Sequence, residues 1–447
     1  MRFRSFQFSL AVLLLACGTV AAQTDPVSDS SPGPMPYGRG ERPALQYSGS
    51  ALPTNLFSLE LLSETAYDSN VYNNNTFAVS DAVFNLGARL GYRRQAQDLS
   101  FGFEYQPYGV IYGQTGDRNA LDHALQMDLS YNFGPRWNVR LREAAAYRTG
   151  LFGSPSRHEF VSEMDSPTRL NDGIFTPLAR SLENNLRADA NYQYGTRLSF
   201  GGFGGLLHRN YIEEPGESAG QDSREANAGM QVRYRMARRT TLGFLYMYQQ
   251  MDFEQRSETG VHSGLLSVAW QPAPGLTLNV FGGPQRSHSR HRVQAAIVLF
   301  GQSFLLVGQT ADDGWHPAFG GTVAWQDERT ALQLGLRRTI TDGGGLLPGS
   351  VTSTRVEFAG RRRLGRSWHA VFSAAEAYST ASGLSGKVDA TTAGVGLERS
   401  LSERLITRFG YNLVRQRGAS FLPLADVDRS RVSIGLHYRL AASGSGR

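Results

Sequence analysis

Arginines recur at even spacing along this chain, as in Arg140 and Arg142 and in Arg404 and Arg408. An even spacing places both side chains on the same face of a β-strand, because successive side chains of a strand alternate between its two faces. The guanidinium fork is suited to bidentate contacts with carboxylates and sulfates. Lys387 is the only lysine, which either reflects genome base composition or marks a surface that recognises anions.

Catalysis and metal binding have no comparable pattern. The 9 histidines form no Ser/His/Asn or Asp/His constellation that spacing alone would reveal. His288, His291 and His316 flank an apolar segment, but no carboxylate or thiol stands at a fixed spacing from them. The formal charge of +6 is modest for 447 residues and does not indicate a nucleic-acid partner. We expect no enzyme activity, no metal and no cofactor.

The elements that must position the arginines are strands. Residues Arg431 to Leu440 read R-V-S-I-G-L-H-Y-R-L, with apolar side chains at every even position. The same alternation occurs in Phe84 to Arg93 and in Leu125 to Phe133. Period-two alternation along most of a chain is typical of a transmembrane β-barrel, with one face toward hydrocarbon and the other toward water.

Short and long connections alternate between the strands. Arg94 to Asp98 is one of the short set, and Gly150 to Arg180 is the longest of the long set. The fold predicted is all-β: an antiparallel up-and-down transmembrane β-barrel of about eighteen strands, with sixteen or twenty as alternatives. Outer-membrane barrels place short turns in the periplasm, so both termini are expected there.

The barrel is expected to span residues 56–440, with a tail at 441–447. Residues 1–22 read as a secretory signal that ends in Val20-Ala21-Ala22, and 23–55 as a flexible, proline-rich periplasmic segment. Cys17 leaves lipoprotein processing open as the alternative. The predicted location is the outer membrane of a Gram-negative bacterium.

Residues on the face opposite the apolar one should line the lumen, and charges there require water or partners. One interpretation is an electropositive pore that favours anionic solutes, and the other is a cross-strand ladder of ion pairs that stiffens the wall; both can hold. The predicted lumen arginines are Arg89, Arg93, Arg140, Arg142, Arg187, Arg233, Arg337, Arg404, Arg408 and Arg431.

Tryptophan positions support this topology. Trp137, Trp270, Trp325 and Trp368 each fall beside a short turn, where aromatic rings settle at a membrane interface. We expect them to be interface anchors, and we expect outer-membrane lipid and lipopolysaccharide to be partners of the barrel. Trp315 alone falls at the opposite end.

Two segments are ambiguous in function or placement. Val293 to Val307 is continuously apolar within a predicted outer loop. It is expected to form a hairpin that folds into the lumen or over its mouth, and two additional strands are the alternative. The long connection Gly150 to Arg180 is either a solvated loop or a gate for the pore.

The segment Ser63 to Tyr72, S-E-T-A-Y-D-S-N-V-Y, follows a proline-rich lead-in. It resembles the start of a family of outer-membrane β-barrel porins found beside exopolysaccharide-secretion genes, and arginine-lined lumens look like those of alginate-type exporters. The resemblance implies a conduit for polysaccharide, expected to be anionic, and a periplasmic polysaccharide-export protein as a possible partner. A general diffusion porin for small anionic solutes and a non-conducting adhesion or scaffold barrel are the alternatives.

The C-terminal end departs from that family. Its barrels usually finish on an aromatic residue that the barrel-assembly machinery reads, whereas the last strand here ends Tyr438-Arg439-Leu440. The assembly machinery is still an expected partner, so we expect it to read an internal signal.

Overall fold

The computed structural model describes residues 54–149, 180–212, 221–253, 257–299, 302–342, 349–381, 386–418 and 426–444. The predicted signal at 1–22 with Cys17, nearly all of the segment 23–55, and nearly all of the connection from Gly150 to Arg180 lie outside the described residues. Among the described residues, no helix is long and apolar enough to cross a membrane.

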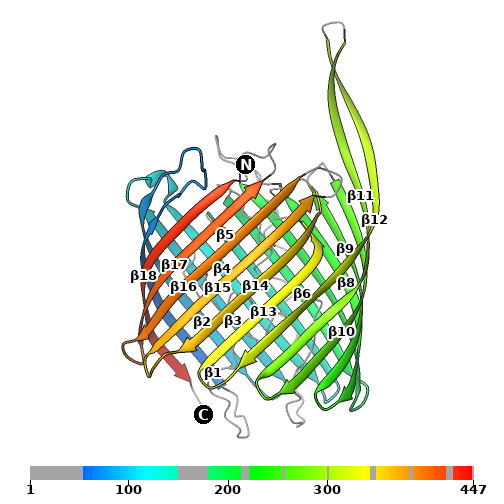
Figure 1. Ribbon diagram of the computed structural model, residues 1–447. Helices are drawn as coiled ribbons and strands as arrows, with labels where there is room; N and C mark the ends of the chain where they lie inside the picture. The colour runs from blue at the N-terminus through cyan, green and yellow to red at the C-terminus, as the bar shows by residue number, and fades with distance from the viewer. Residues whose placement is uncertain are drawn as a thin grey trace.

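The described chain forms one 18-stranded antiparallel sheet. Each strand pairs with its neighbours in the sequence, and the first strand also pairs with the last, so the sheet closes into a barrel (Figure 1). The predicted fold and strand number are confirmed. The strands are β1 Thr54–Asp68, β2 Asp81–Gln95, β3 Leu99–Tyr112, β4 Ala120–Phe133, β5 Trp137–Arg148, β6 Arg180–Gln193, β7 Leu198–Ile212, β8 Ser223–Ala237, β9 Thr240–Phe253, β10 Ser257–Ala273, β11 Leu276–Leu299, β12 Gln302–Gln326, β13 Thr330–Thr341, β14 Val351–Arg363, β15 Trp368–Ala381, β16 Lys387–Ser400, β17 Leu405–Gly418 and β18 Val427–Gly444.

The alternating sequence separates the two faces of the sheet. In β18, Val432 and Ile434 are 56% and 48% exposed, whereas Arg431 and Ser433, which alternate with them, are 2% and 8% exposed. Removing one large aliphatic side chain from water is worth roughly 1.5–3 kcal/mol. A continuous outer face of such side chains therefore requires a hydrocarbon environment, and the barrel spans a membrane.

The two rims of the barrel differ in their connections. The short-connection rim carries 96–98, 134–136, 194–197, 238–239, 274–275, 327–329, 364–367 and 401–404. The long-connection rim carries 69–80, 113–119, 149–179, 213–222, 342–350 and 419–426, and also the shorter 254–256, 300–301 and 382–386. The start of β1 and the end of β18 both lie at the short-connection rim, because Leu56 pairs with Gly444.

The short turns are set by local backbone chemistry. Gly134 and Gly275 adopt φ of +68° and +79°, a conformation that favours glycine. In the turn between β12 and β13, the backbone amides of Arg329 and Thr330 donate to the Asp327 carboxylate and lower its pKa. Each of these features reverses the chain within a few residues.

The segment 293–307 does not fold as expected. Strands β11 and β12 run through it as one ladder, paired without interruption from Leu276 with Trp325 to Leu299 with Gln302. The pair rises well above the rim of the barrel, so it neither enters the lumen nor supplies two additional strands (Figure 1). The backbone ladder of the flanking strands continues through the segment that the sequence had assigned to an outer loop.

Replacing Gly275 with alanine is expected to destabilise the β10–β11 turn. The left-handed backbone costs a non-glycine residue roughly 1–2 kcal/mol, and a Cβ there would lie 2.1 Å from the carbonyl oxygen of Gln326. Urea unfolding of the barrel in detergent should show a loss of at least about 1 kcal/mol. Gly195→Ala is the control, because a Cβ on Gly195 meets nothing within 4 Å; equal stability losses in the two variants would contradict the prediction.

Candidate functional site

The inner wall carries the predicted arginines. Arg404 is the exception, because it lies outside a strand and is exposed in the turn before β17. Its carbonyl oxygen accepts a hydrogen bond from the backbone amide of Arg439. The others alternate with outward side chains and share a face with buried residues of their strands. They are Arg89 and Arg93 in β2, Arg140 and Arg142 in β5, Arg187 in β6, Arg233 in β8, Arg337 in β13, Arg408 in β17 and Arg431 in β18.

Ion pairs bridge the seam where the barrel closes. Glu60 of β1 accepts Arg439 of β18 at 2.9 Å and Arg89 of β2 at 3.4 Å. Further along β1, Glu64 pairs with Arg431, and both side chains are almost fully buried. The first and last strands are therefore joined by charged side chains as well as by the backbone ladder.

The same seam continues to the long-connection rim. Asp68, at the end of β1, accepts two nitrogens of Arg429, and Arg429 also donates to the side-chain oxygen of Asn73 at 2.8 Å. Asp68 and Arg429 are 0% and 3% exposed. This pair holds the start of the 69–80 connection against β18.

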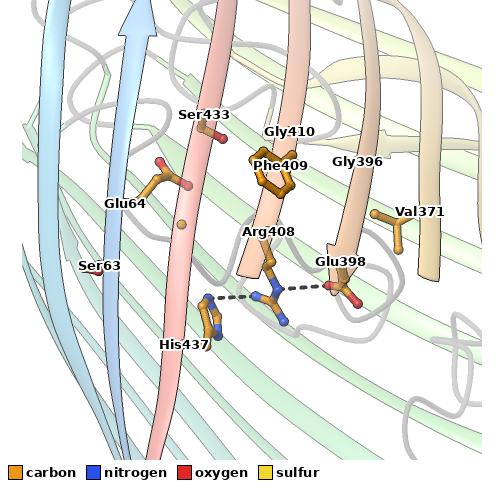
Figure 2. A pocket seen from close by; sticks show the side chains of 11 residues that line it. Ser63, Glu64, Val371, Gly396, Glu398, Arg408, Phe409, Gly410, Ser433 and His437 are labelled. Carbon is orange, nitrogen blue, oxygen red and sulfur yellow. Dashed lines mark hydrogen bonds and ion pairs between the residues drawn. The ribbon is translucent and has the colours of Figure 1, made fainter. Parts of the chain in front are cut away.

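A second cluster lines a hollow in the inner wall formed by β1 and β15 to β18. The Glu398 carboxylate lies between Arg361, at 2.8 Å, and Arg408, at 2.9 Å. Arg408 also lies 2.9 Å from Nε2 of His437, and Figure 2 shows Arg408 between that ring and Glu398. Two guanidiniums share the Glu398 carboxylate here.

A third cluster joins β5, β6 and β7. Asp189 accepts Arg142 at 2.9 Å and Arg187 at 2.8 Å. The guanidinium of Arg187 lies 5.0 Å from the centre of the Phe203 ring, a cation–π contact. One carboxylate again serves two arginines, so the three described side chains together carry one more positive charge than negative.

The end of β13 reaches across the interior of the barrel. Asp342, directly after β13, pairs with Arg209 of β7 and accepts the Ser223 hydroxyl of β8 at 2.8 Å. Strands β8 to β12 lie between β7 and β13 in the closed sheet. The contact therefore spans a chord of the barrel at its long-connection rim.

Apolar and hydroxyl contacts support that chord. Ile340 belongs to a buried cluster with Met251 of β9 and Val261 of β10, and Ser350 accepts a hydrogen bond from Thr259 of β10. Strand β12 pairs with β13 only as far as Phe319 with Arg338. Beyond that point the ends of β13 and β14 lean inward, which narrows the barrel at this rim.

Sequence reasoning missed several of these charges. Arg209 lies in a strand whose inward residues Phe203 and Leu207 are apolar and whose outward residues include Gly202 and Gly204, so alternation of apolar residues pointed to the wrong face. Glu60 and Glu64 were missed for a similar reason, because β1 has apolar residues on its inner face and Ser63 and Thr65 on its outer one. The even spacing of Glu60, Glu64 and Asp68 was the available signal.

The expected interface tryptophans lie where the sequence placed them. Trp137 and Trp368 begin β5 and β15, and Trp270 and Trp325 lie close to the ends of β10 and β12. All stand at the short-connection rim. The Arg399 guanidinium lies 5.1 Å from the centre of the Trp368 ring on the outer face. Their role as membrane anchors stays a prediction.

The histidines at the base of the β11–β12 extension do not converge. His288 bonds to Asp313 at 2.8 Å on the outer face, whereas His291 faces Gly349 on the inner side. Within the described ranges, no group of three or more His, Cys, Asp or Glu side chains could hold a metal ion.

No family model matches the sequence, and no curated protein matches it. Solved structures match at low identity. OccAB4 of Acinetobacter baumannii has a TM-score of 0.42 and 10% identity, over 87% of this chain and 98% of that one. OccK2 (OpdF) of Pseudomonas aeruginosa has 0.41 and 11%, over 86% and 98%, and OpdK of the same organism, crystallised with vanillate, has 0.40 and 12%, over 86% and 98%. At this level of likeness, the matches assign no solute to this chain.

Buried and exposed ion pairs of the seam should differ in their contribution to stability. Arg431→Ala removes the guanidinium from the buried Glu64 carboxylate and leaves the neutral amide of Asn85, at 3.1 Å, beside it. We expect a loss of about 3–5 kcal/mol in the free energy of unfolding. Arg439, which is 61% exposed, is the matched position, and Arg439→Ala should cost no more than about 1 kcal/mol. Urea titration in detergent would measure both, and an Arg431→Ala barrel as stable as Arg439→Ala would contradict this account of the seam.

Proposed function

We propose that the barrel is a passive, water-filled outer-membrane channel that favours small anionic solutes. The observation that supports it is the sharing of carboxylates on the inner wall, where Asp189 and Glu398 each serve two guanidiniums. A wall that keeps positive charge after its ion pairs are formed attracts anions and repels cations. The paired geometry also fixes the guanidiniums, so that an anion meets a preformed surface.

The solute class follows from the shape of the long-connection rim. The ion pair between Asp342 and Arg209 carries the end of β13 across a chord of the barrel. This chord narrows the opening of the barrel at that rim, so a small acid should pass more easily than a polymer. A polysaccharide conduit, which the sequence resemblance implies, remains the second candidate because the same arginines would also attract an anionic polymer.

The orientation belongs to the same proposal. Outer-membrane barrels place short turns in the periplasm and longer loops outside the cell. With that rule the short-connection rim, which carries Trp137, Trp270, Trp325 and Trp368, faces the periplasm. The long-connection rim and the β11–β12 extension then face the exterior.

Neutralising the shared clusters should reduce anion selectivity. In planar bilayers under a salt gradient, the double variant Arg187→Gln, Arg408→Gln is expected to lower the anion-to-cation permeability ratio about twofold or more. Arg399→Gln is the control because Arg399 lies on the outer face beside Trp368. An unchanged reversal potential in the double variant would reject the electropositive lumen, and absence of any conductance in the wild type would favour the scaffold alternative.

Releasing the chord should widen the pore. In Asp342→Ala, Arg209 keeps Glu183 at 3.1 Å as a partner, so the barrel should still fold. We expect the variant to have a higher single-channel conductance than wild type. In liposome swelling, the entry rate of disaccharide acids should increase over wild type by a larger factor than that of monosaccharide acids. Asp313→Ala, an outer-face change, is the control. If long oligouronates pass through the wild-type channel and block its conductance while they do so, the polysaccharide conduit would be favoured instead.

A further inference from the structure

The outer face of β11 carries three basic side chains in a row at the long-connection rim. Arg286, His288 and Arg290 alternate with Ser287 and Ser289, which point inward and are 4% and 1% exposed. Arg286 and His288 are 56% and 45% exposed. The basic row therefore lies on the membrane side of the wall and not in the lumen.

Aromatic residues mark the depth of this row. In the ladder, Arg286 is paired with Trp315 of β12 and with His262 of β10, and His262 is paired with Tyr248 of β9. Trp315 is 69% exposed on the outer face. Tryptophan and tyrosine rings settle at the boundary between hydrocarbon and headgroups, so His288 and Arg290, further out along β11, lie at headgroup level.

One carboxylate partly neutralises the row. Asp313 lies 2.8 Å from Nδ1 of His288 and 3.9 Å from Arg286. Arg290 donates from Nε to Nε2 of His288 at 3.2 Å. His288 therefore connects Arg290 to Asp313 through its two ring nitrogens.

The outer ends of the guanidiniums remain available to a ligand. Glu258 stands opposite Arg290 in the ladder, yet among the described residues Arg290 forms no ion pair with it or with any other acid. Arg290 therefore keeps its terminal nitrogens for an anion, and within the described ranges the ion pair of Arg286 is the long contact to Asp313. Both groups lie where a lipid headgroup would meet the barrel.

We propose that this face binds the phosphate groups of a diphosphorylated glycolipid in the outer leaflet. Arg286 and Arg290 are four positions apart on the strand and therefore separated by about 13 Å. The two phosphates at opposite ends of one disaccharide headgroup can contact both residues across this distance. Guanidinium–phosphate hydrogen bonds are charge-assisted and can be bidentate. The inference depends on the outer-membrane location but not on the solute or on an open pore.

Lipid binding to the purified full-length barrel tests the proposal. Diphosphoryl lipid A, monophosphoryl lipid A and phosphatidylglycerol are titrated into detergent-solubilised protein, and bound lipid is counted by native mass spectrometry. Wild-type protein should bind the diphosphoryl lipid most tightly, and Arg286→Gln, Arg290→Gln should weaken it about tenfold or more. Arg399→Gln is the matched control, because it removes an outer-face arginine beside a tryptophan at the other rim.

Three outcomes would overturn the proposal. They are unchanged binding in the double variant, an equal loss in Arg399→Gln, and wild-type affinity for phosphatidylglycerol equal to that for diphosphoryl lipid A. Folding of each variant is checked by its heat-dependent mobility on gels, and the single variant Arg290→Gln replaces the double variant if the latter does not fold. Channel selectivity is measured separately, so failure of lipid binding leaves the proposed channel function to its own test.

Discussion

The structure depends on satisfying every backbone amide and carbonyl that lies in hydrocarbon, where an unpaired group costs several kcal/mol. A single sheet achieves this only by closing, so the pairing of β1 with β18 is the contact on which the other strands rely. The chain strengthens this junction with Glu60, Glu64 and Asp68 on β1, each bonded to an arginine of β18. Closure and charge pairing therefore occur at the same place.

Once the sheet is closed, the two faces have different solvents and the charges must be placed inside. Removing arginines from bulk water is unfavourable unless partners are close, and the wall supplies them from neighbouring strands. At Asp189 and at Glu398, two guanidiniums share one carboxylate. The ion pairs of the wall and the positive charge proposed for the lumen involve the same side chains, so the two interpretations of the sequence do not compete.

Much of the fold could be predicted from the sequence because period-two alternation reports directly on a sheet with one apolar face. Strand number, the short turns and the inner face of Arg89 or Arg431 followed from that rule. The rule failed where apolar residues face inward, as in β7 around Phe203 and Leu207, so Arg209 was missed. It also could not show that Asp342 meets Arg209, because a contact across the barrel leaves no local pattern. The length of β11 and β12 was missed because the apolar segment Val293 to Val307 was assigned to an outer loop.

The extension of β11 and β12 has a mechanical consequence. Strand β12 pairs with β13 only from Phe319 onward, and among the described residues no strand adjoins its other edge between Gln302 and Ala318. Main-chain groups along that edge can be hydrated but cannot be immersed in acyl chains. Sinking the barrel further into the bilayer would strip water from the main-chain groups of this edge beyond Trp315, so the protruding hairpin limits how deep the barrel can lie in the membrane.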